Sequence, residues 1–219
     1  MGRLLYLTRL LMDKYGDLYG VTQLGGAFGW GVVYKLNKKG VITVLHSFAG
    51  GMADGCEPFG TPAMDTDGNL YGTTYLCGSS NDGIVWKVSK NRTETVLHNF
   101  SGYPTDGQYP LSGVILDTAG NLYGTTSEGG TFGPGTVYKL NKRGALNILH
   151  SFDGTDGENP LGGVADSLGH AENIHLLQAV RCNVENSRSG LIAGLGGREL
   201  SGVYREPWLK ATHQKIRHT

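Results

Sequence analysis

The phrase GNLYGTT, at residues 68–74 and again at 120–126, decides the fold of this chain, and GDLYGVT at 16–22 repeats it with two changes. The three copies stand 52 residues apart. Other landmarks keep this step: GVVYKL, GIVWKV and GTVYKL begin at 31, 83 and 135, and VLHSF, VLHNF and ILHSF begin at 44, 96 and 148. DGCEP, DGQYP and DGENP begin at 54, 106 and 156, the last copy two residues early. A period near 50 residues is typical of propellers and solenoids.

Each repeat contains four short apolar runs separated by turn residues. In the third repeat they are NLYGTT (121–126), GTVYKL (135–140), LNILHSF (146–152) and PLGGV (160–164). Their length and their Val, Ile, Tyr, Thr and Phe content indicate strands, and residues 16–165 show no sustained helical period. We therefore predict an all-β fold, a β-propeller-like array of about three four-stranded blades over residues 1–170. The expected blades are 16–67, 68–119 and 120–170.

The alternation of side chains indicates that each blade is covered on both sides. In NILHSF, Ile148, His150 and Phe152 share one face while Leu149 and Ser151 share the other, and both faces are largely apolar. A single blade cannot bury such faces, so neighbouring blades are needed. Three blades are fewer than the four to eight of a closed propeller. The chain is therefore expected to be a fragment, an open array, or part of an oligomer that completes the ring.

Composition excludes two function classes. Lys and Arg total 19 and Asp and Glu total 19, so no strongly basic field favours nucleic acid. The sequence contains no stretch of 18 apolar residues, so no membrane span is predicted. The 36 glycines stand beside Asn, Asp and Pro at regular positions, which is turn chemistry. Cys56, Cys77 and Cys182 lack metal-site spacing and are odd in number, so we expect small buried or incidental thiols.

The two ends of the chain depart from the repeat. MGRLLYLTRLLM at 1–12 resembles a poor signal peptide, but Arg9 interrupts its apolar run and its second half aligns with a strand. Residues 171–219 resemble nothing upstream; a short helix at about 171–181 is expected, with the rest irregular or disordered. Either a shifted gene end or a genuine terminal cap explains this tail.

The landmark series GTVYKL…LHSF…DG…P…GG…D..GNLYGTT resembles the GloVer tandem-repeat family of bacterial surface proteins, over residues 10–166. The resemblance implies repeated β-blades in secreted or envelope-anchored proteins, and hence an extracellular or cell-envelope location. This chain shows fewer repeats than expected, no clear signal peptide and no recognisable anchor. The family has no assigned catalytic residues to carry over, and no cofactor is expected.

Two sets of repeated residues are predicted to be structural. Three equivalent imidazoles facing a propeller axis could bind a metal, but each shares a strand face with an aliphatic residue and a Phe. We therefore expect them to pack between blades and to hydrogen-bond to a neighbouring strand. The repeated positions are His46, His98 and His150, together with Tyr19, Tyr71 and Tyr123.

The stretch DTDGN offers a weak metal candidate through Asp65, Asp67 and Asn69. A calcium loop of this type needs a Glu at position 12, and that position holds Leu76. A tight hairpin turn with positive φ explains the stretch and its two equivalents, so we predict a turn.

The loops GGAFGWG (25–31) and GGTFGPG (129–135) carry Phe28, Trp30 and Phe132, which could stack on a sugar or a peptide, or tuck back over the blade edge. No Ser/His/Asp or Cys/His set stands out. We expect a non-catalytic binding or display module with a glycan or protein ligand, and self-association to complete the propeller. The alternatives are a fragment without independent function and a propeller hydrolase or lyase.

Overall fold

The computed structural model describes residues 9–164, which form three four-stranded antiparallel sheets. The first sheet comprises β1 (Leu11–Met12), β2 (Leu18–Thr22), β3 (Val32–Leu36) and β4 (Ile42–Ser47). The second comprises β5 (Gly55–Met64), β6 (Leu70–Cys77), β7 (Ile84–Val88) and β8 (Glu94–Asn99). The third comprises β10 (Ile115–Leu116), β11 (Leu122–Thr126), β13 (Thr136–Leu140) and β14 (Leu146–Ser151), while β9 (Gly107–Gln108) and β12 (Glu128–Gly129) form a small pair.

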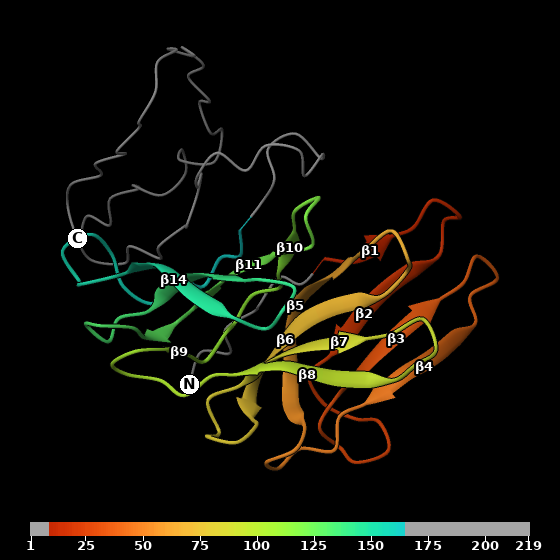
Figure 1. Cartoon of the computed structure of the whole chain (residues 1–219). Coiled ribbons are helices and arrows are strands. Elements are labelled where there is room, and N and C mark those ends of the chain that lie inside the picture. The colour runs from red at the N-terminus through yellow and green to blue at the C-terminus, as the bar shows by residue number, and fades with distance from the viewer. Residues whose placement is uncertain (1–8, 165–219) are drawn as a thin grey trace, which may run out of the picture. The chain divides into compact units, whose positions relative to one another are not determined.

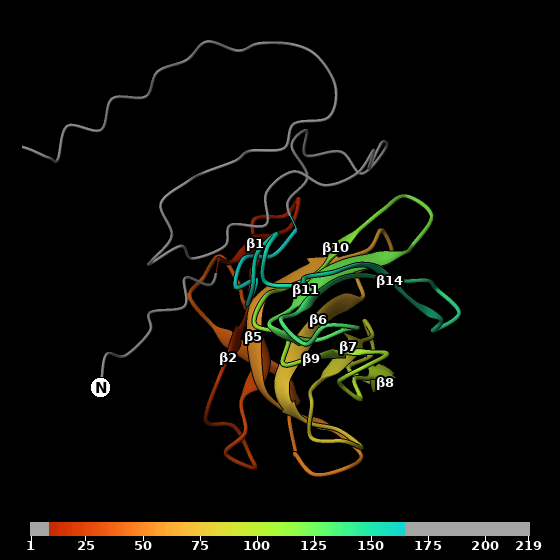
Figure 2. The same cartoon turned by 90° about the vertical axis from the view of Figure 1, so that its left-hand side faces the viewer.

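The sheets follow one another along the chain, as the colour gradient in Figures 1 and 2 shows, and each has the strand order of a propeller blade. The prediction of an all-β, propeller-like array of three four-stranded blades is confirmed for the described residues. Among residues 9–164 no helix is long and apolar enough to cross a membrane. The expected boundary at 170 and the tail 171–219, with its helix at 171–181, lie outside the described residues.

The sheets begin at other residues than the expected blades do, so the expected blade boundaries need a correction. Boundaries at 16, 68 and 120 separate each LYG strand from the strand before it, yet β5 pairs with β6 and β10 pairs with β11 in one sheet. The short turns 65–69 and 117–121 force this pairing, because a chain that reverses within a few residues places its two arms side by side. The crossing to the next sheet occurs instead after β4 and β8.

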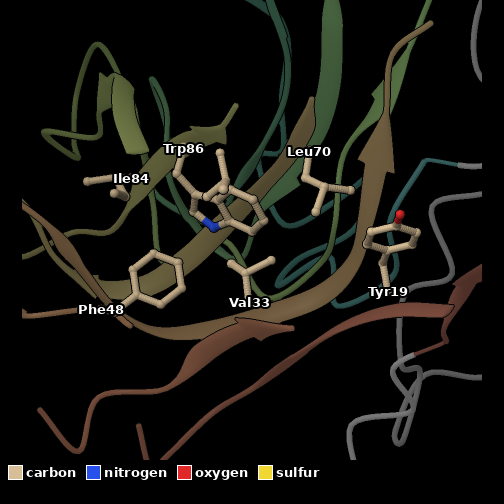
Figure 3. Packing of buried hydrophobic residues seen from close by; sticks show 7 residues of the cluster. Tyr19, Val33, Phe48, Leu70, Ile84 and Trp86 are labelled. Carbon is tan, nitrogen blue, oxygen red and sulfur yellow. The ribbon is translucent and has the colours of Figure 1, made fainter. Parts of the chain in front are cut away.

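Two apolar clusters between successive sheets form the core. We call the face of a sheet that points toward the preceding sheet its leading face, and the opposite face its trailing face. The first cluster joins the trailing face of the first sheet (Tyr19, Val33, Phe48) to the leading face of the second (Leu70, Ile84, Trp86, Val88). Figure 3 shows Val33 and Phe48 on one side of this cluster and Leu70 and Trp86 on the other. The second cluster joins Val85 and Phe100 to Val114, Leu122, Tyr138 and Leu140 of the third sheet.

Equivalent aromatic contacts mark the two interfaces between sheets. Phe48 meets Trp86 edge-on with ring centroids 5.8 Å apart, and Phe100 meets Tyr138 in the same way at 5.2 Å. Edge-to-face pairs at this separation stabilise by more than the area they bury. The repeat in sequence is therefore a repeat of one interface.

Close backbone approach links the strands that precede the LYG phrases. A Cβ atom built on Gly60 would stand 1.8 Å from the backbone nitrogen of Gly113, so only glycine fits there. Nearby, the hydroxyl of Thr73 donates to the carbonyl oxygen of Ser112 at 2.6 Å. These contacts fix the separation of the second and third sheets at this point.

Connections alternate between two ends of each sheet because the strands are antiparallel. We call one the turn end; its turns are 13–17, 37–41, 65–69, 89–93, 117–121 and 141–145. The other, the loop end, carries residues 23–31, 48–54, 77–83, 100–106, 127–135 and 152–160. At the loop end, the backbone N–H of Glu57 donates to the carbonyl of Trp30, and that of Tyr109 donates to that of Asp82, each at 3.0 Å. These bonds hold the loop ends of neighbouring sheets together.

A disulfide joins Cys56 in β5 to Cys77 at the end of β6, which corrects the expectation of incidental thiols. The two residues stand on adjacent antiparallel strands with their Cα atoms 5.4 Å apart, which suits a disulfide. Their equivalents in the third sheet are Gln108 and Gly129, so the bridge belongs to the second sheet. The third cysteine, Cys182, lies outside the described residues.

Candidate functional site

The predicted site residues fall at opposite ends of the sheets. Phe28, Trp30 and Phe132 lie at the loop end, whereas Asp65, Asp67 and Asn69 lie in a hairpin turn at the turn end. The structure therefore does not bring the two predicted groups together.

The three predicted aromatic rings are exposed to solvent. Phe28 is 60% exposed, Phe132 61% and Trp30 42%. Further large apolar side chains are exposed on neighbouring loop-end segments, namely Leu24, Met52 and Tyr103. These three residues could not be predicted from the sequence, because isolated apolar residues in glycine-rich loops carry no periodic signal. Within the described residues, the exposed large apolar side chains of connecting segments are therefore concentrated at the loop end.

The loops of the first and third sheets share one conformation. In the first, the backbone N–H of Gly25 donates to Gly29 O (3.2 Å) and that of Gly31 to Gly25 O (2.9 Å). In the third, Gly129 donates to Gly133 O (2.9 Å) and Gly135 to Gly129 O (3.2 Å). Positive φ at the glycines permits this tight path. Phe28 and Phe132 are thus presented in the same way from two sheets.

Trp30 is held in place on the loop of the first sheet. A Cβ built on Gly50 would stand 3.1 Å from Cδ1 of the indole and 3.5 Å from Sγ of Cys77, so the indole lies close to Gly50 beside the disulfide. The glycine at position 50 has φ +71°, which other residues rarely adopt. The ring keeps part of its surface in solvent while its backbone carbonyl binds the next sheet.

The loop end carries acidic but no basic side chains. Its six segments contain seven carboxylates and neither Lys nor Arg within the described residues, and the seven are Asp54, Asp82, Asp106, Glu128, Asp153, Asp156 and Glu158. Three of them hydrogen-bond to histidines: Asp54 to His46, Asp106 to His98 and Asp156 to His150. The remaining charge makes this end unfavourable for an anionic ligand.

Each repeated histidine hydrogen-bonds to the aspartate of the following DG landmark. His46 Nε2 lies 3.2 Å from Asp54 Oδ2, and the third pair, His150 and Asp156, is 2.7 Å apart. The middle pair, His98 and Asp106, is 2.9 Å apart. Each imidazole also meets its neighbouring Phe ring edge-on. Each His–Asp hydrogen bond, called a joint below, connects the last strand of one sheet to the segment that follows it. Among the described residues, no group of three His, Cys, Asp or Glu side chains is suited to hold a metal ion.

The aspartate of the first joint is stabilised in its ionised form. Burial works against ionisation of Asp54, but the hydrogen bond from His46 and the backbone N–H groups of Ala49 and Gly55 outweigh burial and lower its pKa. These aspartate partners were not predicted from the sequence, although the DG landmark repeats eight residues after His46 and His98. The shared period of the two landmarks was the signal.

The DTDGN stretch uses its carboxylate inside the turn. Oδ1 of Asp65 accepts the backbone N–H groups of Asp67 (3.0 Å) and Asn69 (2.9 Å). Oδ2 accepts the side-chain amide of Asn69 and the hydroxyl of Tyr71, each at 2.8 Å. Although burial opposes it, these bonds lower the pKa of Asp65. All four acceptor positions of this carboxylate are occupied by the protein itself.

The repeated tyrosines complete the same turn in all three sheets. Tyr19 donates to Asp13 at 3.1 Å and Tyr123 to Asp117 at 3.0 Å, as Tyr71 does to Asp65. A lysine ammonium lies over each ring, 5.4 to 5.6 Å from its centroid, at Lys35, Lys87 and Lys139. This position is suited to cation–π attraction.

A groove of about 810 Å³ lies at the turn end between the first and second sheets. Its lining includes Leu45, Leu70 and Val88, which belong to or pack against the first core cluster. Lys90 and Arg92 also line it. Because its apolar lining residues already pack between the two sheets, few side chains of the groove are available to contact a ligand.

The fold and the repeated contacts between sheets define the class of protein. Three antiparallel sheets with a common 52-residue period, linked by equivalent Phe–aromatic contacts, are a β-propeller-like repeat module. The chain belongs to the Gloeobacter/Verrucomicrobia repeat family, whose family model matches residues 6–173. This confirms the resemblance noted from the sequence.

Solved structures with a similar fold include two lyases. A streptogramin B lyase structure matches 64% of this chain and 38% of its own, with 18% identity and a TM-score of 0.39. Virginiamycin B lyase from Staphylococcus aureus matches 65% of this chain and 40% of its own, with 10% identity and a TM-score of 0.38. This chain thus spans about two fifths of those it matches. No curated protein matches the sequence significantly.

Proposed function

We propose that this module binds a ligand through its loop end and acts without catalysis at the cell exterior. The observation that carries the proposal is the exposure of Phe28 and Phe132 on two loops with the same backbone conformation, with Trp30 beside the first. Rigid loops that hold aromatic rings in solvent form a binding surface at little conformational cost.

The chemistry of the loop end favours an uncharged glycan as the ligand. The C–H groups of a sugar ring pack on aromatic faces, and the rings here are spread over the first and third sheets. Carboxylates without accompanying Lys or Arg disfavour phosphate, sulfate or carboxylate groups on the ligand. A protein ligand would have to offer neutral or basic contacts.

The disulfide supports a location outside the cytoplasm. Structural disulfides form and persist in oxidising compartments and are rare in the cytosol. The Cys56–Cys77 bridge ties the two strands of a hairpin rather than two reactive loops, which suits a structural role. This agrees with the extracellular or envelope location that the family resemblance implies.

The test is a screen of the full chain against neutral and acidic glycans, followed by titration of each hit. We expect a neutral glycan to bind, and Phe28→Ala, Trp30→Ala and Phe132→Ala each to weaken it by roughly tenfold at unchanged Tm. The double variant Lys90→Ala/Arg92→Ala changes exposed residues of the opposite end and serves as the matched control. Binding that survives the loop variants but fails in the control would move the site to the groove at the turn end. Turnover of a glycan would favour the hydrolase or lyase alternative.

A further inference from the structure

The residue before the proline of each DG landmark has a positive φ. Glu57 has φ 55°, Tyr109 58° and Asn159 48°. Residues other than glycine rarely adopt this conformation, and a following proline favours extended backbone instead. We call these three the pre-proline residues. The chain thus accepts the same unfavourable backbone conformation three times.

The pre-proline position differs from the other positions that have a positive φ in all three copies of the repeat. Within the described residues, each of those other positions holds glycine in at least two copies. Arg92 at the turn end, for example, has Gly40 and Gly144 as counterparts, and both counterparts of Asn81 are also glycines. Glycine adopts a positive φ at no steric cost. A side chain kept at such a cost in every copy is typical of a ligand contact.

One backbone frame holds all three pre-proline residues. Each following proline lies against a glycine of the preceding loop, and the pairs are Pro58 with Gly31, Pro110 with Gly83 and Pro160 with Gly135. The backbone N–H of each pre-proline residue donates to a carbonyl of that loop, and the bonds are Glu57 to Trp30 (3.0 Å), Tyr109 to Asp82 (3.0 Å) and Asn159 to Pro134 (2.8 Å). The frame is therefore constant while the side chain differs from copy to copy.

Two of these bonds attach pre-proline residues to the loops that carry the exposed aromatic rings. Glu57 bonds to Trp30 itself, and Asn159 bonds to Pro134, which stands two residues after Phe132. All three pre-proline residues retain part of their surface in solvent. A ligand that packs on the exposed rings therefore has these residues beside it.

Two of the pre-proline side chains meet a residue of the preceding sheet. The side-chain amide of Gln23 donates to Oε2 of Glu57 at 2.9 Å, and the rings of Tyr75 and Tyr109 have centroids 5.1 Å apart. Gln23 and Tyr75 are counterparts in the repeat. A carboxylate has about four acceptor sites, so Glu57 can hold Gln23 and still accept hydroxyl donors. The first junction is thus polar and the second aromatic.

We propose that the pre-proline residues contact the glycan bound at the loop end and determine which sugar is accepted, an inference that rests on the function proposed above. Glu57 and Asn159 offer hydrogen bonds to hydroxyl groups, whereas Tyr109 offers a ring to a C–H face. Because the backbone frame is constant, an exchange of side chain alters the contact without altering the frame.

The experiment is calorimetric titration of the full chain with neutral oligosaccharides of glucose, galactose, mannose and xylose. Glu57→Asn and Tyr109→Asn introduce the residue that the third sheet already carries in this frame, and asparagine tolerates a positive φ. We expect each to lower the affinity for the best probe by roughly tenfold and to change the order of preference among the probes.

Stability and a matched control separate ligand contact from a structural role. Glu57→Asn should leave Tm unchanged. Tyr109→Asn loses the ring contact with Tyr75, so its Tm should fall slightly, and binding is measured well below it. Arg92→Asn makes the same kind of exchange at a positive φ of the turn end, and should change neither affinity nor preference.

The outcomes distinguish this inference from the proposed function. If Phe28→Ala and Phe132→Ala weaken binding while the pre-proline variants keep native affinity and preference, the loop end binds glycans without these residues and the inference is wrong. An equal loss for every probe, with the order of preference unchanged, would also overturn a role in specificity. If no probe binds the native chain, the proposed function fails and this inference fails with it.

Discussion

Gly72 faces the indole of Trp86 across two paired strands, and this contact explains why the LYG phrase keeps its glycine in all three copies. A Cβ at Gly72 would stand 2.4 Å from Cζ2 of the ring, and Trp86 is fully buried. The glycine leaves a flat floor on which the ring lies. Nothing in the sequence alone identified the ring as the reason, because it stands on a different strand.

We expect Gly72→Ala to lower the free energy of unfolding by about 1–3 kcal/mol, because the buried indole has no free space into which it can move. Gly20→Ala is the matched comparison. Tyr34 lies against Gly20 in the same way, but Tyr34 is only partly buried, so its ring can shift and the loss of stability should be smaller. Urea unfolding measures both. Equal losses would show that the ring contact is not the reason for the glycine.

At the scale of the hairpin, the β5–β6 turn depends on one carboxylate. Asp65 accepts four hydrogen bonds from the turn and from Tyr71, whereas the side chain of Asp67 is exposed. A side chain that satisfies several backbone donors holds the turn geometry, and thereby the register of the two strands. The disulfide spans the far end of the same hairpin.

We expect Asp65→Ala to destabilise the chain by about 1–3 kcal/mol and Asp67→Ala to have almost no effect. Calcium should leave the thermal midpoint of the native chain unchanged, because the acceptor positions of Asp65 are used. Calorimetry with calcium and with a chelator measures this. If calcium raised the midpoint, and either substitution abolished the increase, the turn would be a metal site after all.

At the scale of the whole molecule, Glu94 gives the interface between the first two sheets a dependence on pH. Its counterparts in the other sheets are Ile42 and Leu146, and its Oε1 is buried without a hydrogen-bond partner among the described residues. Burial, reinforced by the charge of Asp54, raises the pKa of Glu94 to about 7. A carboxyl whose pKa is raised on folding stabilises the protein fully at acid pH, and that contribution is lost as the pH rises through about 7.

We expect Glu94→Gln to match the native chain at pH 5 and to be more stable at pH 8. The gain should be on the order of 1 kcal/mol, because Glu94 is only half-buried and water screens much of the effect. Glu128→Gln, which removes a carboxylate from an exposed loop, is the control for the loss of one charge. Urea unfolding at both pH values measures the difference. The same gain at both pH values would contradict the assignment.

The sequence alone predicts the strands and their number well, because period, turn residues and apolar runs all agree. It could not predict at which residue one sheet ends and the next begins, because a periodic sequence can be divided at any point. Only the pairing of the strands decides where the boundary lies. The Cys56–Cys77 bridge depended on that same pairing. The exposure of Phe28 and Phe132 followed from loop packing, which residue type does not specify.

Both halves of the contact between sheets are encoded within a single period of the sequence. Trp86 and Phe100 lie 14 residues apart, yet one faces the sheet before and the other the sheet after. A tandem duplication of one such unit in the gene therefore inserts a sheet that already fits both of its new neighbours. Lineages that carry this repeat can gain or lose units by unequal crossing-over without first evolving a new contact.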